Sequence, residues 1–351
     1  MQVAIYSAAA LPADPWRRPV LTIDVHNHYV PPEVADDARR GDGFDGMRTE
    51  VVDGQEWVVH RQGYRYPLLP AFHDHETRLA AMDERGVDVG VLSIAPTLFM
   101  YWTEASGAAD FARRTNDALA AFAAEADGRI RPVANLAMQD PDAAVAELRR
   151  AVADLGMCGA QIGPVVGDLS LDDSSFRPLL AAAAELDVPL IVHPSNVGVR
   201  RGLGDFYLTN LVGNPLESTI CAARLIFGGV LDELPGLRIV LMHGGGYLPY
   251  QFGRLDHGHH VRPEARDCAH DPSSYLTRFW YDTITHATEP LRYLIGLVGA
   301  SRVVYGSDFP FDMAGGPYAE QLAGIELDPA DDAAIRGGNA ADLFGLKIEE
   351  A

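Results

Sequence analysis

Two histidines at alternate positions, His26 and His28, follow a short apolar run and give the strongest chemical signal in the chain. In a β-strand, side chains at positions i and i+2 point to the same side, so both imidazoles would project together. His193 and Asp308 each stand at the end of another apolar run. Three neutral imidazoles and one carboxylate, with a position open to water, are typical of a catalytic metal site. We therefore expect these four residues to hold one divalent metal ion, with zinc as the first choice and manganese as the alternative.

His243 ends a further apolar run and is followed by three glycines, Gly244, Gly245 and Gly246. We expect it to act as a general acid/base and not as a metal ligand, because the ordinary imidazole pKa of about 6.5 suits proton transfer near neutrality. The alternative is a structural histidine that caps the next helix. Asp308 is a second candidate for a catalytic base. The glycines would let a ligand approach the backbone and would leave N–H groups free for an anion.

Other histidine-rich segments are interpreted as structural. In His73-Asp74-His75-Glu76, the aspartate is predicted to cap the helix that follows. His257, His259 and His260 are predicted to form a surface or subunit-contact turn. His286 follows an apolar run and is left open between a structural role and a place near the site.

Composition excludes several classes of function. The chain has 351 residues with 28 Lys+Arg and 49 Asp+Glu, a formal net charge of −21, which disfavours nucleic acid or an anionic membrane as a partner. The only lysine is Lys347, so no internal lysine can form a Schiff base or bridge two metal ions, and a single ion is expected. Three cysteines far apart argue against a disulfide scaffold and predict a cytoplasmic location. No apolar stretch reaches the ~20 residues that cross a membrane.

The elements that must position these residues are short apolar runs alternating with helical stretches. They predict an α/β fold with one (β/α)₈ barrel, in which the carboxyl ends of all the strands meet on one face. In the alternative, a doubly wound open sheet, the first and last strands would lie apart, so His26 could not meet Asp308. The eight runs are Leu21–Val25, Val87–Ile94, Ile130–Ala137, Gly159–Ile162, Val188–Val192, Ile239–Met242, Phe279–Thr283 and Val303–Tyr305.

The barrel is predicted to span residues 21–346, between an N-terminal arm at 1–20 and a tail at 347–351. An insertion at 29–74, after the first strand, is far longer than the usual loop of about 2–6 residues. It contains a hairpin-like piece around Asp53-Gly54, and we expect it to cover the carboxyl-terminal mouth of the barrel. The segment Pro329–Leu346 is predicted to be a closing helix, with Gly337-Gly338-Asn339 as a turn or cap within it.

Several motifs together resemble the amidohydrolase-2 family of metal-dependent (β/α)₈ enzymes, in the branch around aminocarboxymuconate-semialdehyde decarboxylase. The resemblance runs from about residue 21 to about residue 346. The matching stretches are Ile23-Asp24-Val25-His26-Asn27-His28, Met82-Asp83-Glu84-Arg85-Gly86-Val87, Met100-Tyr101-Trp102, Gly159-Ala160-Gln161-Ile162-Gly163, Val192-His193-Pro194, Phe227-Gly228-Gly229-Val230, His243-Gly244-Gly245-Gly246, Gly253-Arg254 and Tyr305-Gly306-Ser307-Asp308-Phe309-Pro310-Phe311.

The resemblance implies roles for individual residues. His26, His28, His193 and Asp308 match the family's metal ligands, and His243 matches its general acid/base. Arg254 matches an arginine that binds substrate carboxylate in the neighbouring subunit; the alternative is a surface arginine paired with Asp256 or Glu264. Phe311 matches an apolar wall of the pocket, and Trp102 is also expected to contact substrate.

Two positions depart from the decarboxylase pattern and leave the substrate open. Val58 stands where we place a carboxylate-binding arginine of the family, so Arg61 is expected to take its role, with Arg65 as the alternative. Ser195 stands where a tryptophan follows the His-Pro pair.

We therefore predict a metal-dependent non-oxidative decarboxylase of a small aromatic or unsaturated carboxylic acid, assembled as a homodimer or a higher homo-oligomer. The alternative is a metal-dependent hydrolase of an amide, a lactone or a cyclic C–N bond. A third class, a barrel that binds a ligand or partner without catalysis, is disfavoured because the full set of metal-ligand types is present.

Overall fold

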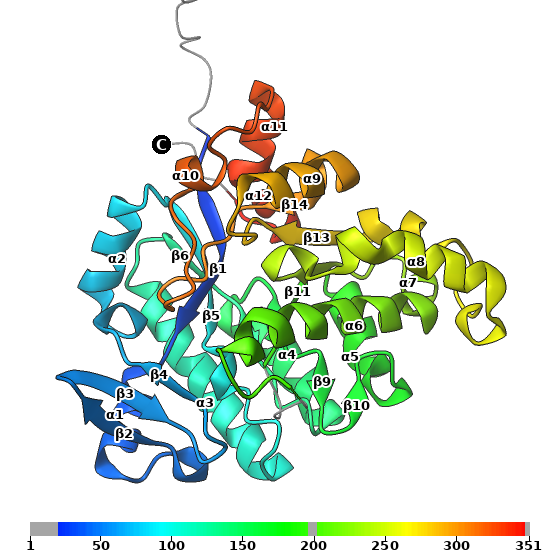
Figure 1. The fold of residues 1–351 in the computed structure, drawn as a ribbon. Coiled ribbons are helices and arrows are strands. Elements are labelled where there is room, and N and C mark those ends of the chain that lie inside the picture. The colour runs from blue at the N-terminus through cyan, green and yellow to red at the C-terminus, as the bar shows by residue number, and fades with distance from the viewer. Residues whose placement is uncertain (1–19, 196–201, 348–351) are drawn as a thin grey trace, which may run out of the picture.

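The computed structural model describes residues 20–195 and 202–347, and its centre is a ring of parallel strands surrounded by helices (Figure 1). Most of the predicted N-terminal arm and residues 348–351 of the predicted tail lie outside the described residues. The strands of the ring are β1 (Ile23–Tyr29), β5 (Val89–Ile94), β6 (Ile130–Pro132), β7 (Ala134–Asn135), β8 (Ala160–Ile162), β11 (Leu190–Val192), β12 (Ile239–Leu241), β13 (Phe279–Asp282) and β14 (Val303–Val304).

Hydrogen bonds close these strands into a barrel. One parallel sheet has the order β1-β5-β6 and the other the order β14-β13-β12-β11-β8-β7. β6 and β7 are two parts of one strand, interrupted at Val133. The last gap closes where the N–H of Val25 donates to the carbonyl of Tyr305 at 2.9 Å and the N–H of His28 donates to that of Phe309 at 2.8 Å. The (β/α)₈ prediction is therefore confirmed, and the open-sheet alternative is excluded.

Helices pack around the ring, and several begin where the sequence predicts. The side chain of Asp74 accepts a hydrogen bond from the N–H of Thr77 at 2.8 Å, which confirms the predicted helix cap. The helices of the barrel are α2 (His75–Glu84), α3 (Ala105–Ala124), α4 (Pro141–Leu155), α5 (Arg177–Glu185), α6 (Asn214–Phe227), α7 (Val230–Glu233), α8 (Leu248–Val261), α9 (Thr288–Val298), α10 (Tyr318–Gln321), α11 (Pro329–Ala333) and α12 (Asn339–Leu343).

The predicted turn in the closing helix is wrong. Residues Ala334–Gly338 form a π-helical stretch that continues directly from α11 into α12. Glycine serves close packing there, because a Cβ on Gly337 would lie 2.1 Å from the carbonyl oxygen of Leu21. The helical segment can therefore lie directly against the start of β1.

The barrel interior has an apolar half and a polar half. One buried apolar cluster fills the interior and includes residues of α12, which closes the amino-terminal end. Polar groups therefore concentrate at the carboxyl-terminal mouth. The buried members of this cluster that lie in the strands of the ring or directly beside them are Ile23, Val25, Val91, Val133, Ile191, Val240, Met242 and Val304.

β1 is longer than predicted, because it continues through both histidines to Tyr29. Its pairing with β5 shifts register between Asp24 and Asn27, where β1 has one residue more than β5. Such a bulge changes which residues of the strand face inward. Val25 consequently packs in the apolar interior, and His26, the next residue, also faces inward at the site.

The segment after β1 forms a small projection at one end of the molecule, at the lower left in Figure 1. It contains α1 (Pro32–Arg40) and an antiparallel sheet of β2 (Arg48–Val52), β3 (Gln55–Val59) and β4 (Arg65–Pro67). Asp53 and Gly54, which join β2 to β3, both have positive φ, as two-residue hairpin turns of type I′ require.

The two remaining short strands, β9 (Val165–Val166) and β10 (Leu169–Ser170), pair in an antiparallel hairpin after β8. None of the helices in the described part of the chain is both long and apolar enough to span a membrane.

Candidate metal centre and active site

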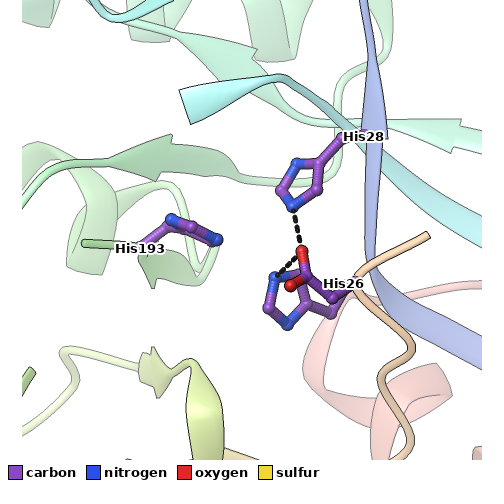
Figure 2. A group of neighbouring side chains, drawn as sticks. His26, His28 and His193 are labelled. Carbon is purple, nitrogen blue, oxygen red and sulfur yellow. Dashed lines mark hydrogen bonds and ion pairs between the residues drawn. The ribbon is translucent and has the colours of Figure 1, made fainter. Parts of the chain in front are cut away.

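Four buried side chains meet at the mouth of the barrel. His26, His28, His193 and Asp308 each offer one ligand atom, and these atoms all lie within 4.8 Å of one another. Figure 2 shows the His26 and His28 rings extending from β1 toward the ring of His193, which follows β11 on the other side of the barrel. The structure thus brings together all four residues that the sequence singled out as metal ligands.

Hydrogen bonds orient two of the three imidazoles directly. His26 donates from Nδ1 to Oδ2 of Asp282 at 2.6 Å, and His193 donates from Nδ1 to the carbonyl of Pro194 at 2.6 Å. These assignments leave Nε2 of both rings unprotonated and directed toward the centre. An acceptor on the other ring nitrogen is the usual arrangement of a metal-binding histidine.

The third imidazole, that of His28, is held indirectly through Ser93 and Gln161. Ser93 Oγ donates to Oε1 of Gln161 at 2.7 Å, so its oxygen accepts from Nδ1 of His28 at 3.3 Å. Gln161 in turn is fixed by a bond from Nε2 to the carbonyl of Ile94 at 3.0 Å. His28 Nε2 then faces Asp308, whose Oδ1 lies 3.1 Å away.

The donor set fits a divalent metal ion. Among the described residues, the Nε2 atom of His193 is buried and has no hydrogen-bond partner, and the buried Nε2 atom of His26 has only Oδ1 of Asp308 beside it, at 3.3 Å. Buried polar atoms without partners are rare because they lose their hydration without compensation. Two unprotonated imidazole nitrogens, a third beside them and a carboxylate are the ligands that zinc and neighbouring metals prefer.

Burial and the two carboxylates set the protonation of the cluster without a cation. Burial lowers the pKa of His28 to about 4 and holds that of His193 well below its ordinary value. Burial also disfavours the charged form of His26, but Asp308 and Asp282 outweigh it and raise its pKa to about 10. Burial alone would raise the pKa of Asp308, yet the neighbouring imidazoles hold it well below 3.8. Without a metal ion, the positive charge of protonated His26 is therefore balanced by the carboxylates of Asp308 and Asp282.

Asp24 ties together the two chain segments that carry His26 and Asp308. Its carboxylate accepts from the N–H of His26 at 3.0 Å and from the N–H and Oγ of Ser307 at 3.0 and 2.6 Å. Asp308 itself has a φ of 61°, a left-handed conformation that is costly for a residue with a side chain. These bonds across the closure of the barrel support that conformation.

His243 lies beside the four-residue cluster but outside it. Its ring centroid is 5.2 Å from that of His26 and 5.1 Å from that of His193, and its Nε2 lies 3.9 Å from Oδ2 of Asp308. The side chain is 15% exposed, whereas the ring of His26 is fully buried. His243 therefore faces both the metal position and the solvent-accessible cavity, as a proton carrier requires.

The glycines after His243 do not provide the predicted anion site. The N–H groups of Gly244, Gly245 and Gly246 donate to Asp282, Met242 and His243, respectively, so none is free for a ligand. A Cβ on Gly245 would lie 2.6 Å from the ring of Tyr281, so this residue is small for packing. Asp282 thus holds both His26 and the turn after His243.

Two adjoining cavities open at the cluster and share His243 and Asp308. The first has a volume of about 370 Å³ and is lined by the projection and by the residues after β11 and β14. The second, of about 570 Å³, extends between α6, α8 and α9 and includes His286 and three tyrosines.

Of the candidate substrate-binding residues Phe311, Arg61 and Trp102, only Phe311 lines a described cavity at the cluster. Phe311 lines the first cavity, with its ring centroid 5.2 Å from that of His28. Arg61 is 75% exposed and lies 3.6 Å from Asp45, and Trp102 donates from Nε1 to the same aspartate at 2.7 Å. Neither is part of the described cavity walls. Their shared contact with Asp45 instead anchors the projection to the loop after β5.

Arg65, the alternative to Arg61, does line the first cavity. Its guanidinium lies over the ring of Trp57, 4.6 Å from the centroid. Nη1 of Arg65 also lies 3.8 Å from Oε1 of Glu50, which is beyond hydrogen-bond distance. A guanidinium stacked in this way can still turn its N–H groups to a planar carboxylate.

Arg254 is exposed on α8 and forms no ion pair with any described residue. The two predicted partners are engaged elsewhere, because Glu264 contacts Arg262 and Asp256 accepts from the N–H of Ser273 at 2.8 Å. The alternative of a paired surface arginine is therefore wrong.

The remaining histidine-rich segments form no second group of metal ligands among the described residues. His257, His259 and His260 lie within α8, so the predicted turn is wrong; His259 contacts the carbonyl of Ala265, and His260 contacts Asp271. The supporting roles of Ser93, Asp24 and Asp282 were not predicted from the sequence. All three are polar residues one position before the end of a predicted strand, which is a usable signal.

Comparisons with known proteins agree with this geometry. A model of an amidohydrolase family matches residues 23–346. The chain is 33% identical over 334 residues to 2-amino-3-carboxymuconate-6-semialdehyde decarboxylase of Dictyostelium discoideum, which covers 93% of this chain and 92% of the relative. It also resembles 5-carboxyvanillate decarboxylase from Sphingomonas paucimobilis, with a TM-score of 0.78, 27% identity and coverage of 93% and 100%.

A further solved structure is dihydroxybenzoic acid decarboxylase from Polaromonas sp. JS666, described with bound manganese and the inhibitor 2-nitroresorcinol. It matches with a TM-score of 0.72 and 25% identity, over 93% of this chain and 97% of the other.

Proposed function

This chain belongs to the amidohydrolase family, and from that premise we propose that it is a metal-dependent non-oxidative decarboxylase of a small aromatic or unsaturated carboxylic acid. The observation that carries the proposal is His243, held beside the four candidate ligands and open to the cavity. Solved structures that resemble the chain are described as decarboxylases of hydroxylated aromatic acids, and the relative from Dictyostelium is also named as a decarboxylase.

The proposed chemistry divides the work between the cavity walls and His243. A divalent ion held by His26, His28, His193 and Asp308 would supply positive charge to the substrate carboxylate and an adjacent oxygen. Phe311 and the other aromatic walls would exclude water from the reacting carbon. The protonated His243 would deliver its proton to that carbon, the bond to the carboxylate would break with loss of CO₂, and His243 would regain a proton from solvent.

We propose zinc as the resident ion, because three imidazoles and a carboxylate are a common zinc set. Manganese is the alternative, supported by the relative described with bound manganese. We also propose a cytoplasmic location, supported by three free cysteines. The proposed organisation is an arm at 1–20, a barrel at 21–346 with its insertion at 29–74, and a tail at 347–351.

Product analysis tests the reaction class. The purified protein, loaded with metal, would be incubated with a set of benzoic and unsaturated acids, and the products would be followed by mass spectrometry and CO₂ release. Loss of CO₂ is expected. A product heavier by one water, from an amide, lactone or cyclic C–N substrate, would instead establish the hydrolase alternative.

We propose Arg65 in place of Arg61 as the residue that binds a substrate carboxylate. Arg65→Gln is expected to raise KM or lower kcat/KM by about 10-fold or more, because a charged hydrogen bond in a cavity contributes about 1.5–3 kcal/mol. Arg61→Gln is the matched control and is expected to leave kcat/KM close to that of the wild type. Equal effects of the two substitutions would contradict this assignment.

A homodimer, in which Arg254 of one subunit serves the site of the other, is proposed from the exposed face around α8. Tyr250 is 79% exposed, Tyr293 is 45% exposed, and both border the larger cavity. α8 projects from the barrel at the right of Figure 1. An unpaired arginine on such a face is available to a second copy of the chain.

Subunit exchange between two inactive variants tests this arrangement. Arg254→Ala and His243→Ala homodimers would be mixed and allowed to exchange. If Arg254 acts across the interface, each hybrid has one site that lacks both residues and one intact site, so activity is expected to return in part. No recovery in hybrids verified by mass would show that Arg254 acts within its own subunit or not at all.

A further inference from the structure

The wall of the smaller cavity formed by the residues after β11 carries two polar side chains that the proposed chemistry does not use. Ser195 follows His193 and Asn214 begins α6, and both line the cavity with His243. β11 is the fifth strand of the closed ring and β1 is the first, so loops after these strands lie on opposite sides of the mouth. This polar wall therefore starts across the barrel from the projection that carries Arg65.

Both side chains have polar atoms without partners. Ser195 is only 7% exposed, and its Oγ is buried without a hydrogen bond to any described residue. The Oδ1 atom of Asn214 is also buried and unpaired within the described structure. Folded proteins seldom leave such atoms without a partner, because burial removes their hydrogen bonds to water and nothing replaces those bonds. Two of them on one cavity wall indicate that a ligand supplies the missing bonds.

The neighbouring backbone keeps the serine hydroxyl clear. A Cβ on Gly163 would lie 3.2 Å from Ser195 Oγ and 2.8 Å from Cε2 of Tyr101. The N–H of Gly163 donates to the Tyr101 hydroxyl at 3.1 Å, so this N–H is not available to Ser195. Glycine at this position and a small residue at 195 together preserve space beside the hydroxyl.

The charges around the cavity decide what kind of group fits there. Apart from the histidines, the charged residues of its lining are Arg65, Asp308 and Asp312. The two aspartates repel a second carboxylate everywhere except close to Arg65. The residues near Ser195 and Asn214 on this wall, Thr209 and Asn210, are neutral. A neutral group with both a donor and an acceptor matches this wall best.

We propose that Ser195 and Asn214 form a subsite for a hydroxyl substituent of the acid substrate, an inference that rests on the proposed decarboxylase function. The substituent would accept a hydrogen bond from Ser195 Oγ and donate one to Asn214 Oδ1. A methyl ether could accept but not donate, and a hydrogen atom could do neither. The subsite therefore selects hydroxylated acids over methoxylated ones, and methoxylated acids over unsubstituted ones.

The test compares matched acids on matched variants. Benzoic acids that carry hydroxyl, methoxy or hydrogen at each ring position would be measured with wild type, Ser195→Ala, Asn214→Leu and the exposed control Ser301→Ala. Affinity would be measured by calorimetry with the metal-loaded protein, kcat/KM by CO₂ release, and metal content by elemental analysis. A hydroxyl next to the carboxylate can also bind the metal, so the informative quantity is the hydroxyl-to-hydrogen ratio in each variant.

Ser195→Ala and Asn214→Leu are each expected to reduce the hydroxyl-to-hydrogen ratio by about 10-fold (about 1.4 kcal/mol) at one ring position, with unchanged metal content. Ser301→Ala is expected to leave the ratio unchanged. An undiminished ratio in both cavity variants, or the absence of any binding that depends on Ser195, overturns the subsite. A reduced binding ratio without CO₂ release from any acid would uphold the subsite and refute the proposed reaction.

Discussion

His243→Ala is expected to lower kcat by about 10²–10⁴-fold while the protein keeps its metal ion, because a positioned general acid/base contributes about that factor. The geometry separates its role from that of the four candidate ligands. Its Nε2 lies 3.9 Å from the nearer Asp308 oxygen, and the group whose ligand atoms all lie within 4.8 Å of one another does not include it. The measurement is kcat on the best acid, together with elemental analysis of the same sample.

Added imidazole provides a sharper readout than loss of activity. The ring of His243 is partly exposed to the cavity, so a small base can enter the space that alanine leaves. Imidazole is expected to restore part of kcat in His243→Ala and to leave Arg65→Gln unaffected. A His243→Ala protein that has lost its metal would show that His243 is a ligand and would contradict the division of roles.

His193→Ala is expected to weaken metal binding by more than about 100-fold and to abolish activity. Substitution of residues that merely orient metal ligands typically costs about 10–100-fold in affinity, and removal of a ligand exceeds that. The substitution also leaves the metal ion with an incomplete set of protein ligands. Metal content after dialysis, measured as ions per chain, checks this prediction directly.

Two controls accompany that measurement. His270→Ala, an exposed position outside α8, is expected to retain one ion per chain and full activity. Wild-type protein stripped by a chelator is expected to be inactive and to recover when one equivalent of zinc or manganese is returned. Two ions per chain in the active protein, or full activity without metal, would refute the single-ion site.

The sequence by itself determined the barrel and the identity of the residues at its mouth. Both faces of a parallel strand are buried, so continuous apolar runs alternate with amphipathic helical stretches. This pattern can be recognised in the sequence without knowing any tertiary contact. Several of these runs end at, or a few residues before, a residue able to bind a metal or move a proton, among them His26, His193, His243 and Asp308. Once the strands close into a ring, His26 and Asp308 must meet, because the first and last strands are neighbours.

Only the tertiary structure decided how those residues are aimed. The bulge in β1 lets Val25 fill the apolar interior while His26 faces the metal position, and strict alternation along the strand does not give both. The left-handed conformation of Asp308 is supported by the hydrogen bonds that Ser307, the residue before it, donates to Asp24, which lies 284 positions before Asp308 in the chain. Such support is long-range and has no local sequence signature.

The same reason explains the choice between Arg61 and Arg65. The two arginines are four positions apart in one hairpin, and nothing in their residue type favours one over the other as the residue that reaches the site. The antiparallel sheet brings Arg65 beside Trp57 at the cavity, whereas Arg61 lies at the exposed turn near Asp45. Which residue reaches the site is set by the pairing of β3 with β4 and by the packing of that sheet on the barrel, because these fix the direction of each side chain.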